Sequence, residues 1–114
     1  MSFRKVVAAF VLLLAAVGCR SRVIHVRLVN TSSQPLSTIV VDYPGATFGV
    51  DSLAPGKTFN YVIKPTDNGA LKIQFSDAQG ASHTYSGPTV QKGQEGDIEI
   101  NITQNSISAE PALR

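Results

Sequence analysis

The sequence predicts an all-β protein, a single small antiparallel β-sandwich of about seven strands, with a small closed β-barrel as the alternative. Three observations favour this class. Apolar and polar residues alternate with a period of two in short runs, as they do in half-buried strands. Gly and Pro, nine and six in number, separate these runs at short intervals, as turns require. After residue 18, no apolar run repeats at helical spacing, so we expect no helix there.

The first nineteen residues differ in composition from the rest of the chain. Arg4 and Lys5 precede an uninterrupted apolar run over residues 6–17. A positive segment followed by a short apolar segment is typical of a secretory signal peptide. An uncleaved membrane anchor is the alternative, but the run is shorter than the roughly 20 residues that a spanning helix needs. Such an anchor would also place Arg20 and Arg22 on the translocated side, against the positive-inside tendency.

The stretch Ala16-Val17-Gly18-Cys19 resembles the bacterial lipoprotein signal, in which small or branched residues precede an invariant lipid-bearing Cys. Ala16 stands where that family usually has Leu. The resemblance implies that residues 1–18 are a lipoprotein signal peptide and that Cys19 carries a lipid anchor with acyl chains such as palmitate. It also implies a cell-envelope location. Because Arg20 follows the Cys, the outer membrane facing the periplasm is expected if the source is Gram-negative.

Residues 19–22 should form the lipidated Cys and a short tether. Three extended residues reach only about 10 Å, so residues 20–22 keep the domain close to the bilayer. Arg20 and Arg22 either contact anionic headgroups or form a solvated entry to the first strand. Cys19 is the only cysteine in the sequence, which excludes an intramolecular disulfide.

The chain after the signal segment is formally neutral. The whole sequence has ten basic and eight acidic residues, and Arg4 and Lys5 would be lost with the signal peptide. A nucleic-acid binder needs a basic stripe to neutralise phosphates, so this class of function is excluded. The remaining length suits one small domain, which we place at residues 23–104.

Four runs with strand periodicity fill the first half of this domain: residues 23–29, 37–43, 48–51 and 58–64. The polar segment 30–35 and the pair Pro44-Gly45 separate the first three runs. Pro55-Gly56, before the fourth run, fits the central positions of a type II turn. In that turn Pro fixes φ, and Gly accepts the positive φ that follows.

Three further runs complete the predicted sandwich: residues 70–75, 81–85 and 97–103. Asp77-Ala78-Gln79-Gly80 predicts a tight hairpin connection, and residues 86–96 predict an irregular link. Residues 105–114 lose the periodicity and contain Pro111, which predicts a disordered C-terminal tail. The inward positions of the strands predict a core of Ile24, Val26, Leu28, Ile39, Val41, Phe59, Tyr61, Ile73, Phe75, Ile98 and Ile100.

Residues 52–63, SLAPGKTFNYVI, resemble a turn and strand found in immunoglobulin-like and fibronectin-III-like bacterial modules. The shared features are the Leu-x-Pro-Gly turn and the amphipathic strand after it. The resemblance covers residues 23–103 in pattern and only the quoted stretch in motif. It implies an immunoglobulin-like sandwich but no particular activity, because such folds carry many functions.

The sequence contains no recognisable catalytic or metal-binding motif. His25 and His83 lack the spacing of a metal site, and no Cys in the domain accompanies them. There is no Gly-x-Ser-x-Gly elbow and no phosphate loop, and the carboxylates are scattered over turns and strand faces. We therefore predict no enzyme, no metal, no cofactor and no small-molecule substrate.

Two hypotheses for function remain, with an enzyme as a distant third. The protein is a non-catalytic protein-binding or scaffolding module that meets another envelope protein, or it is a structural envelope accessory without a discrete ligand. A binding surface is expected at loop 44–49, next to Tyr43. Phe48 lies there between two glycines, and aromatic residues in loops are frequent interface anchors. The alternative is that Phe48 folds inward to cap the sandwich.

Overall fold

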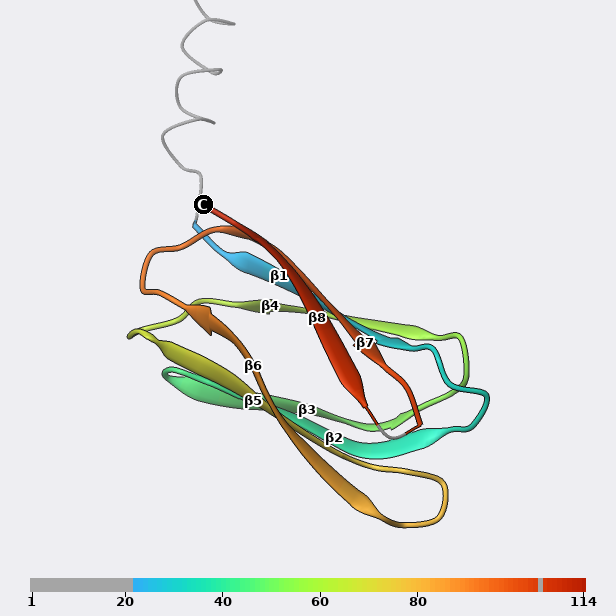
Figure 1. The fold of residues 1–114 in the computed structure, drawn as a ribbon. Helices are drawn as coiled ribbons and strands as arrows, with labels where there is room; N and C mark the ends of the chain where they lie inside the picture. Colours follow the sequence, from blue (N-terminus) through green and yellow to red (C-terminus); the bar gives the residue numbers. More distant parts are fainter. Residues whose placement is uncertain (1–21, 105) are drawn as a thin grey trace, which may run out of the picture.

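Eight strands form two stacked four-stranded sheets in the computed structural model, which describes residues 22–104 and 106–114 (Figure 1). The order in the first sheet is β4 (Thr58–Ile63), β1 (Ile24–Asn30), β7 (Gly96–Ile102) and β8 (Ile107–Leu113). The order in the second sheet is β3 (Ala46–Leu53), β2 (Leu36–Tyr43), β5 (Gly69–Ser76) and β6 (Ser82–Val90). The described chain is thus the predicted all-β sandwich and not a closed barrel.

The chain passes between the two sheets several times, and one pair of neighbouring strands is parallel as a result. Strands β1 and β7 run parallel, with Ile24 opposite Gly96, whereas the other neighbouring pairs are antiparallel. The first sheet is therefore mixed, whereas the sequence predicted a purely antiparallel sandwich. The connectivity also differs from that of immunoglobulin domains. Their first two strands share a sheet, whereas here β1 and β2 lie in opposite sheets.

The core lies between the sheets and follows the predicted alternation in the central strands. The predicted core residues on these strands are buried: Ile24, Val26, Leu28, Ile39, Val41, Ile73, Phe75, Ile98 and Ile100. The exceptions are on β4, where Phe59 is half-buried and Tyr61 is exposed. Since β4 is an edge strand, these two inward side chains lie at the open margin of the sandwich, whereas Ile63 at the end of β4 is buried.

Two stretches expected to be irregular are strands. The expectation of a disordered tail over residues 105–114 is wrong, because β8 pairs with β7 and buries Ile107 against the core. Pro111, which lacks an N–H, fits because β8 is an edge strand. The expected irregular link over residues 86–96 is wrong in its first part, since β6 continues to Val90. The sandwich therefore extends beyond residue 104.

Asn30 is the buried polar side chain among the described residues. Its Nδ2 donates hydrogen bonds to the carbonyl oxygens of Gln34 (2.9 Å) and Leu53 (2.8 Å). Its Oδ1 accepts hydrogen bonds from the backbone N–H (3.0 Å) and the hydroxyl (2.6 Å) of Ser32. One side chain thus joins the end of β1, the crossover to β2 and the end of β3.

The main chain of Asn30 also binds the turn before β4. Its N–H donates to the carbonyl of Lys57 (3.0 Å), and its carbonyl accepts from the N–H of Gly56 (2.8 Å). Within this turn the N–H of Lys57 donates to the carbonyl of Ala54 (3.1 Å), and Gly56 has a φ of +74°. The predicted Pro-Gly turn is confirmed, and its two backbone hydrogen bonds hold the main chain of Asn30 in place.

Replacing Asn30 by Ala should destabilise the domain strongly. The change removes the buried hydrogen bond to the carbonyl of Leu53, and each unsatisfied buried polar group costs about 1–3 kcal/mol. We expect the free energy of unfolding, measured by urea denaturation, to fall by at least about 2 kcal/mol. Asn60→Ala, at an exposed position on β4, is the matched control and should change it by less than about 0.5 kcal/mol. Equal effects of the two changes would contradict this role.

Candidate functional site

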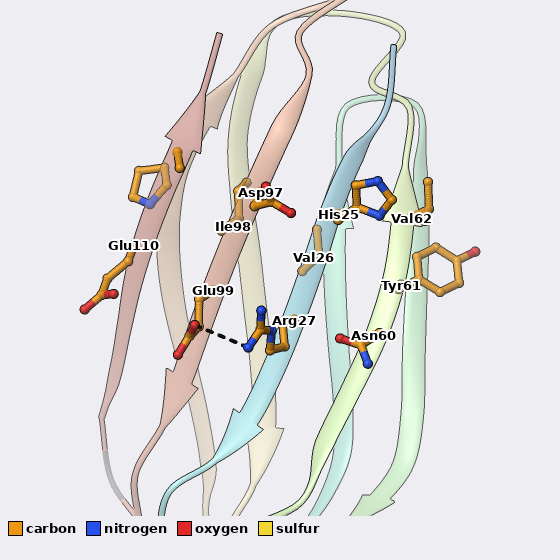
Figure 2. Close-up of a pocket in the computed structure, with 12 residues that line it drawn as sticks. His25, Val26, Arg27, Asn60, Tyr61, Val62, Asp97, Ile98, Glu99 and Glu110 are labelled. Atoms are coloured by element: carbon orange, nitrogen blue, oxygen red, sulfur yellow. Dashed lines mark ion pairs between the residues drawn. The ribbon is translucent and has the colours of Figure 1, made fainter. Parts of the chain in front are cut away.

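A groove of about 900 Å³ lies over the outer face of the first sheet (Figure 2). The strand register places its outward side chains in two rows: Val62, His25, Asp97 and Ala112, then Asn60, Arg27, Glu99 and Glu110. These side chains point outward because successive residues of a strand face opposite sides, and the intervening Val26 and Ile98 are buried in the core. The groove is therefore built directly by strand alternation.

Charge is divided across this groove. Arg27 lies on β1, and the carboxylates of Asp97, Glu99 and Glu110 lie on β7 and β8. Figure 2 shows Arg27 pointing toward Glu99, whereas Glu110 points away from it. Arg27 Nη1 lies 3.8 Å from Glu99 Oε2, and the two side chains are 58% and 40% exposed. An ion pair this exposed contributes about 0–1 kcal/mol. The charged groups therefore contribute little to folding.

The two histidines singled out in the sequence lie in different sheets. His25 is exposed in the groove on β1, whereas His83 on β6 stacks on Phe75, with ring centroids 4.9 Å apart. Within residues 22–104 and 106–114, no group of three His, Cys, Asp or Glu side chains is placed to hold a metal ion.

Beside the groove, four neighbouring aromatic rings close one side of the sandwich. We call Tyr43, Phe48, Phe59 and Tyr61 the aromatic edge. The Phe48 ring is at its centre, 4.2 Å from Tyr61 at an interplanar angle of 13°. It lies 6.3 Å from Tyr43 and 6.4 Å from Phe59. Burial, and secondarily the Tyr61 hydroxyl, raise the pKa of Tyr43 above its ordinary value, so Tyr43 stays a neutral phenol at physiological pH.

The structure brings Tyr43 and Phe48 together but does not make Phe48 a surface anchor. Phe48 is 5% exposed, so the inward alternative holds and the ring is not an exposed anchor, whereas an interface at this segment stays a prediction. The reason is register: Phe48 pairs with Val41, whose side chain faces the core. Its segment belongs to β3, which begins at Ala46 and leaves little loop. Tyr43 is half-buried at the end of β2.

The exposed apolar residues of this region are Tyr61 and Val62, which the sequence reasoning missed as a surface. They are 39% and 49% exposed and occupy consecutive positions on β4. The sequence signal for this surface was the two consecutive apolar residues, Tyr61 and Val62, in a strand that otherwise alternates between polar and apolar residues. Stacking on buried Phe48 supports the Tyr61 ring on one side, so the exposed tyrosine is presented in a fixed position.

The lipidation site Cys19 lies outside the described residues, so its modification remains a prediction. Over the part of the chain that the structure does describe, there is no apolar helix of membrane-spanning length.

Away from the groove, Asp77 organises the hairpin between β5 and β6. Its Oδ1 accepts hydrogen bonds from the N–H groups of Gln79 (3.0 Å) and Ala81 (2.9 Å), and its Oδ2 lies 2.9 Å from Nε2 of His83. The hydrogen bond with His83, followed by the one from Ala81, lowers the pKa of this carboxyl. This arrangement confirms the predicted hairpin and gives Asp77 a structural role.

Comparison with known proteins adds support for the fold. No family model and no curated protein matches this chain. A solved structure described as "NMR structure of the protein from Eubacterium rectale" is similar, with a TM-score of 0.61 and 13% sequence identity over 78% of this chain and 87% of that chain. At this identity the likeness shows a shared fold alone.

The Asp77 hairpin should make stability depend on pH in the acidic range. Because the pKa of Asp77 is lowered from 3.8 in the folded protein, its contribution is fully present above that ordinary value. The contribution is lost as the pH falls through the lowered folded pKa. We expect the difference in free energy of unfolding between wild type and Asp77→Asn to shrink on acidification below pH 3.8. Asp51→Asn, at an exposed position on β3, controls for the loss of one carboxylate, and a constant difference would contradict the linkage.

Proposed function

We propose that the protein is a membrane-anchored lipoprotein of the bacterial envelope that acts as a non-catalytic protein-binding module. The observation that carries the binding part is the exposed pair Tyr61 and Val62 on edge strand β4, beside the charged groove. Protein interfaces combine a few aromatic anchors with a surrounding polar rim. This surface has both parts.

The aromatic edge supports Tyr61 as an anchor. A ring stacked at 4.2 Å on a buried neighbour has already lost much of its rotational freedom before a partner arrives. Binding then costs less side-chain entropy, which is the benefit of a preorganised contact. Asn60 and Arg27 lie opposite each other on the outer face of the same sheet (Figure 2), on the other side of β4 from the Tyr61 ring, and supply hydrogen-bond donors for the rim.

The shape of the groove favours a protein over a small ligand. Pockets for small molecules enclose most of the ligand surface, whereas this groove lies along one face of a sheet. No described element of the chain covers that face (Figure 1). A broad surface or an extended segment of another envelope protein can lie across both rows of outward side chains.

The membrane part of the proposal depends on Cys19 and the signal segment before it. Each buried methylene contributes about 0.8 kcal/mol to membrane binding, so two or three acyl chains anchor a protein almost irreversibly. Substituting Cys19→Ala should remove the acyl mass and move the protein out of the membrane fraction. Mass spectrometry and fractionation of wild type and variant test this, and identical processing and retention of the two would exclude the lipid anchor.

Substituting Tyr61→Ala should weaken partner binding. We expect crosslinking of the lipidated protein to its envelope partner to fall roughly tenfold or more, because truncating an anchor residue costs about 2 kcal/mol. Tyr85→Ala on β6 is the matched control, since Tyr85 is 38% exposed against 39% for Tyr61 but lies in the other sheet. Equal loss with both variants would contradict a specific surface. A general envelope defect without any discrete crosslinked partner would favour a structural accessory instead.

A further inference from the structure

We infer that one end of the sandwich rests on an anionic bilayer surface through a set of exposed cations. This inference rests on the proposed lipid anchor at Cys19 and adds an orientation to it. We call this end the anchor end, and it consists of Arg22 and Val23, the turns 44–45, 64–68 and 91–95, and Arg114.

Backbone hydrogen bonds hold the two ends of the described domain together here. The N–H of Gly96 donates to the carbonyl of Val23 (3.2 Å), which places the entry to β1 beside the start of β7. Arg114 and Glu95 exchange backbone hydrogen bonds of 2.9 and 3.1 Å. The end of β8 therefore lies beside the start of β1 (Figure 1).

The turns of the second sheet belong to the same end. The N–H of Thr66 donates to the carbonyl of Pro44 (3.1 Å), which joins the β4–β5 connection to the β2–β3 turn. The N–H of Lys92 donates to Oδ1 of Asn68 (3.0 Å), which joins the β6–β7 connection to both. The anchor end is thus one continuous surface across both sheets.

Positive charge predominates on this surface. Its exposed cations are Arg22, Lys64, Lys92 and Arg114. Of these, Arg114 Nε lies 3.6 Å from Glu95 Oε1. No carboxylate among the described residues forms an ion pair with the other three cations. Asp67 is the other side-chain carboxylate of these turns, so cationic side chains outnumber carboxylate side chains at this end.

The opposite end of the sandwich has a different charge. It consists of the connections 31–35, 54–57, 77–81 and 103–106. Among their described residues, Lys57 is the one cation and Asp77 the one carboxylate. The two ends therefore differ in charge, and a negative surface would attract the anchor end.

The length of the tether brings the anchor end within reach of lipid headgroups. Cys19 is separated from Val23 by three residues, which span about 10 Å when extended. The screening length is about 8 Å at physiological ionic strength. Cations at the start of β1 and in the neighbouring turns therefore lie where an anionic headgroup layer still acts on them. Each contributes little alone, so together they orient a domain that the acyl chains already hold.

The orientation can be measured on the lipidated full-length mature protein. Gln91→Cys places a thiol at the anchor end, and Gln79→Cys places one at the opposite end. Because the thiol of Cys19 is blocked by the lipid, the new thiol takes a fluorophore selectively. Each labelled protein is reconstituted in vesicles of phosphatidylcholine, with or without phosphatidylglycerol, that contain a headgroup-nitroxide lipid as quencher. The quantity compared is the quenching at residue 91 relative to residue 79.

Phosphatidylglycerol should increase this ratio, and 1 M salt should abolish the increase, since the screening length falls to about 3 Å. The double variant Lys64→Gln, Lys92→Gln should lose the increase, whereas Lys57→Gln at the opposite end should keep it. A ratio that does not respond to phosphatidylglycerol, or that responds equally in both variants, overturns the inference while leaving the anchor intact. A protein that stays in the supernatant contradicts the anchor itself and the orientation with it.

Discussion

The position of the two sheets relative to each other depends on the buried amide of Asn30. Its side chain binds the main chain where β1 leaves for the second sheet and where β3 returns to the first. Leaving a buried amide without its hydrogen-bond partners costs free energy. Asn30 therefore holds in place both segments where the chain passes between the sheets. Apolar contacts can slide by small amounts, but these directional hydrogen bonds cannot. The hydrogen bonds of Asn30 therefore fix how the two sheets are placed relative to each other.

Much of the fold could be predicted because central strands leave a strong pattern. Strands β1, β2, β5 and β7 are covered on one face and flanked by neighbours on both sides, so nearly every inward residue is apolar. Strand β8 lacks this pattern, since an edge strand buries few side chains and accepts Pro111. Sequence periodicity reports burial. It does not reveal which strands form backbone hydrogen bonds with each other, and β8 is held in the sheet mainly by its hydrogen bonds to β7.

The candidate site could be predicted less well, for a related physical reason. Phe48 and Tyr61 both occupy inward positions on edge strands, β3 and β4, yet Phe48 is 5% exposed and Tyr61 is 39% exposed. The difference comes from the aromatic edge, because Phe48 lies at its centre and has the other three rings around it. Strand order depends on contacts between distant segments, which alternation within one strand does not encode. The charged rows of the groove have the same origin. Asp97 and Glu110 become neighbours of β1 and β7 only when the register of three strands is fixed.

The parallel pair of β1 and β7 sets the order in which the domain can assemble. Strand β1 lies at the centre of its sheet, yet one of its neighbours is Gly96–Ile102, near the other end of the chain. Contacts between such distant segments slow folding, because the long intervening loop must close first. During synthesis from the N-terminus, the first strand of the sheet must therefore wait for a strand near the end of the domain. One edge of β1 meanwhile keeps its backbone N–H and C=O groups unpaired until Gly96–Ile102 has been made.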